Sequence, residues 1–156
     1  MDLHYERLVV PVGGTIADER ALALIQHLVH KQLVALTLIY VVEVAQSMAL
    51  DAELPGEVTR GEAALREAER FAKQTLGGRV GQIFTELLQA RSAGAAVVDE
   101  AIDRHADAIV MTAGIRRKHG RPTLGETANY ILMHAPCEVL LARVAPVGTA
   151  EDGAWR

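Results

Sequence analysis

The chain has 156 residues, half of them hydrophobic and 23% charged, a composition that supports one packed domain and argues against a disordered protein. Its formal net charge of −4 argues against a protein that coats DNA or RNA, because such proteins need clustered excess cation. The single cysteine excludes an internal disulfide, no signal-peptide pattern opens the chain, and the longest apolar run, residues 33–42, is too short to cross a bilayer, so we expect a cytoplasmic protein without membrane insertion.

The first half of the chain reads as strand, helix, strand and helix. Residues 7–12 form a short apolar run closed by two glycines, which predicts a buried strand that ends in a tight turn. Residues 15–28 have apolar positions at helical spacing, and Thr15 is the expected cap. Residues 33–44 are almost continuously apolar, as in a strand covered on both faces. Residues 45–57 then predict a loop, and the next helix is expected over 59–76.

The second half repeats this alternation. We expect an edge strand over 80–89, a helix over 93–105 and a buried strand over 108–111. A connection rich in glycine and arginine, residues 114–122, then leads to a helix that ends at Pro136 and to a last strand over 138–142. Five strands alternating with four helices indicate an α/β fold with one doubly wound parallel sheet and helices on both faces.

The position of a ligand site follows from that architecture. In such sheets the crevice lies outside the carboxyl ends of the strands, where the strand order reverses. The two loops that we expect to border it are residues 13–15 and 112–127.

The order of these elements, together with four local segments, resembles the universal stress protein family over roughly residues 5–145. The segments are the opening residues 8–12, the strand at 38–42, residues 106–111, and the helix that ends in His134-Ala135-Pro136-Cys137. The resemblance implies the strand order 3-2-1-4-5, an adenine-nucleotide alpha-hydrolase-like fold, and in one subgroup a bound ATP. It also implies a homodimer paired through the last strand, Glu138 to Val144. We take residues 1–145 as one domain and 146–156 as a flexible tail.

The ATP-binding subgroup carries the pattern Gly-x2-Gly-x9-Gly-Ser/Thr after the fourth strand, and this chain keeps its spacing but changes its residues. Thr112 stands at the first glycine, Ile115 at the second, Gly125 at the third, and Glu126 at the hydroxyl position. Gly13 stands where ATP binders of the family usually have an aspartate near the adenosine. Ile115 would crowd the approach of backbone amides to a phosphate, so the ATP motif is degenerate.

Residues 123–126 also read as a capping box. In this interpretation Thr123 accepts a hydrogen bond from the amide of Glu126, whose side chain reaches back to the amide of Thr123. The chain would then fill its own anion site at the start of the fourth helix.

The opposing signal is a basic loop, Arg116-Arg117-Lys118-His119 with Arg121, whose side chains could hold an anionic ligand instead of the backbone. The alternative reading is a solvated loop that faces an acidic partner. No cofactor is assigned, and ATP or another adenine nucleotide is the candidate ligand. The candidate binding residues are Pro11, Gly13, Thr15, Val41, Met111, Thr112, Ile115, Arg116, Arg117, Gly125, Glu126 and Thr127.

No catalytic or metal site is predicted. His27 and His30 lack an evident third ligand, Cys137 reads as a small packing thiol, and no nucleophile elbow or P-loop is present. The leading hypothesis is therefore a non-catalytic regulatory protein, a homodimer whose ligand orders residues 114–122 and 45–57. One alternative is a ligand-free dimeric adaptor that docks on a regulatory protein or an amino-acid transporter, and a second is a slow nucleotide hydrolase.

Overall fold

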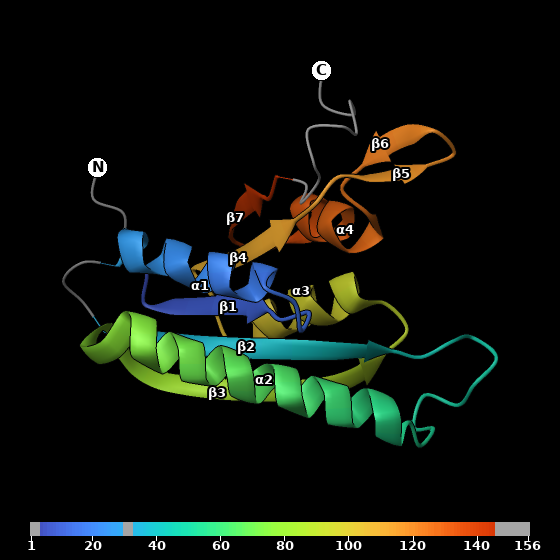
Figure 1. The fold of residues 1–156 in the computed structure, drawn as a ribbon, viewed down its shortest axis with the longest axis horizontal. Coiled ribbons are helices and arrows are strands. Elements are labelled where there is room, and N and C mark those ends of the chain that lie inside the picture. Colours follow the sequence, from blue (N-terminus) through green and yellow to red (C-terminus); the bar gives the residue numbers. More distant parts are fainter. Residues whose placement is uncertain (1–3, 30–32, 146–156) are drawn as a thin grey trace.

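Five parallel strands form one sheet in the computed structural model, which describes residues 4–29 and 33–145. Their order across the sheet is β3-β2-β1-β4-β7, which confirms the predicted arrangement of the five strands (Figure 1). Each strand lies within two residues of its predicted bounds. In chain order these strands are β1 (Arg7–Pro11), β2 (Val34–Glu43), β3 (Val80–Ala90), β4 (Ala108–Ala113) and β7 (Glu138–Arg143).

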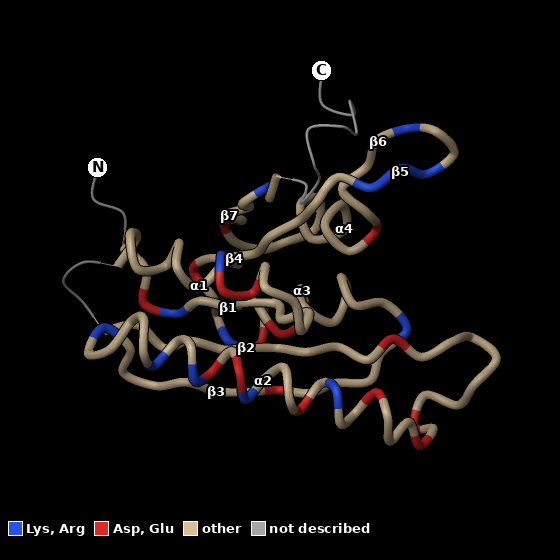
Figure 2. The backbone as a smooth tube through the Cα atoms, viewed as in Figure 1, with Lys and Arg blue, Asp and Glu red and all other residues tan. Residues whose placement is uncertain are grey.

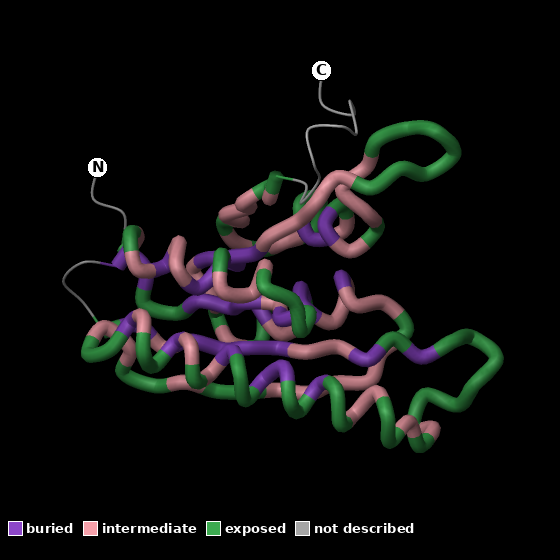
Figure 3. The backbone as a smooth tube through the Cα atoms, viewed as in Figure 1, coloured by how far each residue is buried: buried purple, intermediate pink, exposed green. Residues whose placement is uncertain are grey.

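Four helices cover the two faces of the sheet, and each face encloses its own apolar core. The buried stretches of the chain run along the inner strands of the sheet (Figure 3). On one face α1 (Ala17–Leu28) and α2 (Pro55–Leu76) pack over the strands, and on the other α3 (Ala93–Asp103) and α4 (Glu126–His134) do so. Successive strand residues point to opposite faces, so in β1 Leu8 and Val10 belong to the first core and Val9 to the second. A short 3-10 helix, η1 (Gly77–Arg79), follows α2.

Two segments differ from the sequence-based expectation. Helix α2 begins at Pro55 rather than Thr59, because proline fits the first helical position, where no intrahelical amide bond is needed. The expected connection contains an antiparallel hairpin, β5 (Arg116–Lys118) and β6 (Arg121–Thr123), whose turn residues His119 and Gly120 have φ of 53° and 74°. The flexible tail predicted at 146–156 lies outside the described residues.

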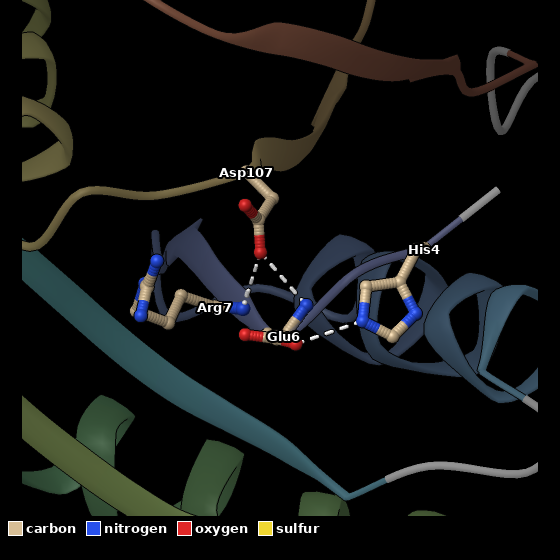
Figure 4. A network of polar contacts seen from close by, with 4 residues as sticks. All are labelled: His4, Glu6, Arg7 and Asp107. Atoms are coloured by element: carbon tan, nitrogen blue, oxygen red, sulfur yellow. Dashed lines mark hydrogen bonds and ion pairs between the residues drawn. The ribbon is translucent and has the colours of Figure 1, made fainter.

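A network of backbone and side-chain contacts joins the amino-terminal ends of β1 and β4 (Figure 4). Asp107 Oδ2 accepts from the amides of Glu6 at 2.7 Å and Arg7 at 2.8 Å, and the Asp107 amide donates to the Arg7 carbonyl at 2.8 Å. Beside it, the hydroxyl of buried Tyr5 donates to Glu138 Oε2 at 2.8 Å, which connects β1 to β7. These contacts therefore hold β1 and β4 together at their amino-terminal ends, opposite to the carboxyl ends where the strand order reverses.

None of the described helices, over residues 4–29 and 33–145, is long and apolar enough to span a bilayer.

Candidate functional site

A crevice of about 480 Å³ opens at the carboxyl ends of β1, β2 and β4. Its floor consists of residues from the carboxyl-terminal halves of the strands, such as Ile39 and Met111, and its rim comes from the β1–α1 turn and from the segment that enters α4. Strand order reverses between β1 and β4, because β2 lies on one side of β1 and β4 on the other. The crevice therefore lies where a doubly wound sheet ordinarily binds its ligand.

Most of the candidate binding residues surround this one crevice. Ile115 and Arg117 are the exceptions and lie outside its lining. Those that line it are Pro11, Gly13, Thr15, Val41, Met111, Thr112, Arg116, Gly125, Glu126 and Thr127. Two loops that are separated by about a hundred residues in the sequence thus meet at one site, although whether they bind a ligand stays a prediction.

Basic residues gather on the hairpin (Figure 2), and one of them, Arg116, supplies the positive charge in a crevice lining that also contains Asp18 and Glu126. Residues 116–122 are all exposed, and successive residues of a strand point to opposite faces. Arg116 lines the crevice, and Lys118, on the same face of β5, lies 3.3 Å from Glu126 at the start of α4. Arg117 points to the other face, where its guanidinium donates to the Gly120 carbonyl at 3.3 Å. The structure therefore separates two arginines that the sequence grouped together.

The predicted capping box is wrong. Helix α4 begins at Glu126, its N-cap is Gly125, and no side chain caps it. Thr123 Oγ1 instead accepts from the Gly125 amide at 3.1 Å and from Asn129 Nδ2 at 3.3 Å. The side chain of Glu126 is 92% exposed and pairs with Lys118, so it stands at the rim of the crevice without filling an anion site.

Gly125 explains why the box does not form. Its φ of 94° and ψ of 164° lie in a region open to glycine alone, and they turn the chain sharply between β6 and α4. This turn removes Thr123 from the cap position. It also places Gly125 beside Arg116, whose Cδ would be in ordinary van der Waals contact, at 3.9 Å, with a Cβ at this glycine.

The carboxylate that does bind backbone amides of its own chain belongs to Asp18 and lies in the β1–α1 turn. Asp18 Oδ1 accepts from the Gly13 amide at 2.9 Å, and Asp18 Oδ2 accepts from the Gly14 amide at 2.8 Å. Burial raises the pKa of the Asp18 carboxyl, and the bonds from the turn amides oppose that rise. Thr15 is not the helix cap that the sequence suggested, since the N-cap is Ile16 and the Thr15 hydroxyl only accepts from the Ala17 amide at 3.3 Å.

Sequence reasoning missed Asp18 as a residue of the site. It was read only as an acidic residue in the first turn of a helix, whereas its position five residues after Gly13 lets it reach back to the turn. Tyr40, which the sequence placed near the end of a strand as a residue that could line the crevice, does line it. Its ring packs on Gly61 of α2, where an added Cβ would lie 2.6 Å from Tyr40 Cδ1.

Over the described residues, no three His, Cys, Asp or Glu side chains are grouped as metal ligands would be. Burial raises the pKa of the Cys137 thiol, which is half-buried at the start of β7.

Comparison with known proteins gives a consistent picture. The model of the universal stress protein family matches residues 4–143. Among solved structures, UspA from Lactobacillus plantarum is 22% identical, with 90% of this chain and 99% of that chain covered and a TM-score of 0.67. A universal stress protein in complex with cAMP is 19% identical, with 92% and 100% covered and a TM-score of 0.65. One from Archaeoglobus fulgidus in complex with dAMP is 19% identical, with 89% and 98% covered and a TM-score of 0.66. No curated protein matches significantly.

Proposed function

The chain belongs to the universal stress protein family, and from this premise we propose that it is a non-catalytic regulatory protein that binds an adenine nucleotide in the crevice. The observation that carries the proposal is the position of Arg116. Its guanidinium-bearing side chain lines the crevice beside the amino-terminal end of α4. A helix N-terminus and an arginine together favour the phosphate of a ligand.

The shape of the crevice supports the same class of ligand. Ile39, Val41, Val97 and Met111 provide apolar surface, and the polar groups stand at the two rims. A volume of about 480 Å³ lies in the range of small-molecule sites, and its lining combines apolar and polar surface, as a nucleotide with an apolar base face and polar edges requires. The complexes with cAMP and dAMP named above are further support, as neighbours with the same fold.

The matched variants R116A and R117A test this function. Both remove one positive charge from β5, but only Arg116 lines the crevice. Because hydrogen bonds to charged groups contribute about 1.5–3 kcal/mol, we expect R116A to weaken AMP binding by about tenfold or more and R117A to change it by less than about threefold.

Calorimetric titration with AMP, cAMP and ATP measures these affinities, and thermal melting gives a second readout. A ligand at 100 times its Kd stabilises the wild-type protein by about 2.7 kcal/mol, which raises the melting temperature by several degrees. The proposal fails if none of these nucleotides moves the melting temperature, or if R117A weakens binding as much as R116A. Release of phosphate from ATP by the wild-type protein would contradict the non-catalytic part.

A ligand-free adaptor is the second candidate, and Glu126 is the observation that favours it. Glu126 lines the crevice beside Arg116, where the phosphate would bind, and its carboxylate pairs with Lys118. Both the negative charge and the loss of a free lysine disfavour the binding of an anion there. The same titrations distinguish the two functions, since an adaptor of this kind would bind none of the three nucleotides.

We further propose that the chain works as a homodimer paired through β7. This strand pairs only with β4 among the described strands, so its other edge is available to a second copy.

A further inference from the structure

The β1–α1 turn is built as an anion-binding concavity. The amides of Gly13 and Gly14 each donate to a different oxygen of the Asp18 carboxylate, at 2.9 and 2.8 Å, and the Thr15 amide also bonds to it. Gly14 has φ of 78°, the left-handed conformation that turns successive amides to one side. Consecutive amides arranged in this way ordinarily bind phosphate or another anion. Here a side chain of the same chain fills that place.

Asp18 stands at the boundary between two hollows of the surface. Together with Gly13, Thr15 and Tyr40, it lines both the crevice and a groove of about 600 Å³ between α1 and α2. A ligand in the crevice would therefore meet the carboxylate, and the amides behind it would already be bonded. The other charged residues that line either hollow are Glu19, Arg60 and Glu67 in the groove and Arg116 and Glu126 in the crevice.

We propose that Asp18 determines ligand specificity at this end of the crevice. Its carboxylate fills the anion site of the turn and so excludes a phosphate from it, and the same carboxylate accepts hydrogen bonds from hydroxyl or amino groups of a ligand. The inference rests on the proposed function for its ligand class, but the blocking of the turn stands on the contacts of Asp18 alone.

Charge and hydrogen-bonding capacity carry the argument. A phosphate at the turn would meet a like charge and would find its amide donors already in use. An ionised carboxylate has about four acceptor positions, of which the turn amides use about three, so at least one position can accept from a ligand donor. Nucleoside hydroxyl and amino groups are such donors. With Arg116 on the opposite rim, the crevice has one end suited to donors and one suited to an anion.

The blocking of the turn is tested with sulfate, followed by the NMR signals of the Gly13 and Gly14 amides. At neutral pH we expect no shift of these signals in the wild-type protein. In D18A the two amides are released, and we expect sulfate to shift both signals and to bind at least tenfold more tightly. E19A is the matched control, because Glu19 is adjacent and does not line the crevice or accept from the turn amides, so it should behave as the wild-type protein does.

The same titration with sulfate can be made on the wild-type protein at lower pH, without any substitution. As the pH falls through the pKa of Asp18, protonation neutralises the carboxylate, and sulfate should begin to shift the same two signals. The proposal is overturned if sulfate shifts these signals in the wild-type protein at neutral pH, or if neither folded D18A nor the acidified wild-type protein shows a shift.

The donor role is tested with adenosine, which carries no phosphate. We expect D18A to weaken adenosine binding by about tenfold or more and E19A to leave it within about twofold. An unchanged affinity in D18A would overturn this role. If the wild-type protein binds neither adenosine nor AMP, the proposed function fails along with the donor role, whereas the sulfate arm still decides whether Asp18 blocks the turn.

Discussion

Gly61 is the glycine of α2 that has no room for a side chain. A Cβ there would lie 2.6 Å from Tyr40 Cδ1 and 2.8 Å from Leu87 Cδ1. Because both neighbours are packed between α2 and the sheet, G61A should overpack this contact and lower the free energy of unfolding by about 1–3 kcal/mol. The ring of Tyr40 lines the crevice, so the change should also disturb the site. Urea denaturation measures the effect on stability.

Gly56 supplies the control in the same helix. It has open space around it and no positive φ, so G56A gains helix propensity without a clash. We expect it to stabilise the protein by about 0.4–1 kcal/mol. Equal effects of the two substitutions would show that the contact with Tyr40 does not govern the role of Gly61.

Single residues also mark the limit of prediction from the sequence. The turn glycines and the strand ends were enough to predict which residues surround the crevice, as for Gly13 and Met111. They were not enough to predict the direction in which a side chain points. Glu126 was expected to turn back to the backbone and lies in solvent, while Asp18 makes the internal contact instead. Both outcomes depend on local backbone angles, at Gly125 and Gly14, that residue types alone leave open.

At the level of elements, the hairpin was missed because it lacks the usual signal of a strand. Its strands have three residues each and carry charged side chains where an alternating apolar pattern would be expected. The turn was the available signal, since two residues between the strands, one of them glycine, fit a hairpin. Helix α2 likewise began at a proline that we interpreted as part of a loop.

The expectation for residues 45–57 also changes at this level. Gln89 Nε2 donates to the carbonyls of Leu50 and Ala52 at 3.0 Å each, and Arg91 donates to the Val44 carbonyl at 3.3 Å. The loop is thus attached to the end of β3, and none of its residues lines the crevice. Of the two segments that we expected a ligand to order, the hairpin alone borders the site.

Gly120 is expected to control how often the hairpin opens. Its φ of 74° is unfavourable for any residue with a side chain, by about 1–2 kcal/mol. The hairpin has two strands and no core residue, so G120A should open it locally and leave the sheet intact. Limited trypsin digestion measures this opening, because Arg117 and Lys118 lie in the hairpin, and we expect several-fold faster cleavage there.

His119 gives the opposite test in the same turn. Its φ of 53° is more acceptable to asparagine, so H119N should cleave no faster than the wild-type protein. Cleavage of G120A at the wild-type rate would show that the turn does not limit the opening of the hairpin.

For the whole molecule, the sequence was sufficient to predict the sheet. Continuous apolar runs such as residues 33–42 indicated strands covered on both faces, and β2 does contribute residues to both cores, with Leu38 in one and Ile39 in the other. The two layers of helices then followed from the alternation of elements. The apolar pattern alone does not distinguish the two edge strands, β3 and β7, as places where a second copy could pair.

The two edges are not equally suited to pairing. Within β3, Glu86 pairs with Arg104, whose guanidinium also lies 4.8 Å from the centre of the Phe84 ring, so this edge strand carries charged side chains that disfavour pairing. Strand β7 is apolar over residues 139–142, and Met133, 80% exposed in α4, precedes it by a few residues. We therefore expect light scattering at micromolar concentration to report a dimer that pairs through β7.

Charge placed beside β7 should separate the two copies. In M133E the twofold symmetry of a dimer would bring two like charges into a partly desolvated contact, and we expect dissociation to be at least about tenfold more favourable. I102E is the matched control, because Ile102 is also exposed, at 51%, but belongs to α3, which packs against α4 and, among the strands, chiefly against β1, β2 and β3. A wild-type monomer would contradict pairing through β7. Equal dissociation of the two variants would place the interface elsewhere, since a contact centred on β7 cannot respond equally to charges on α4 and α3.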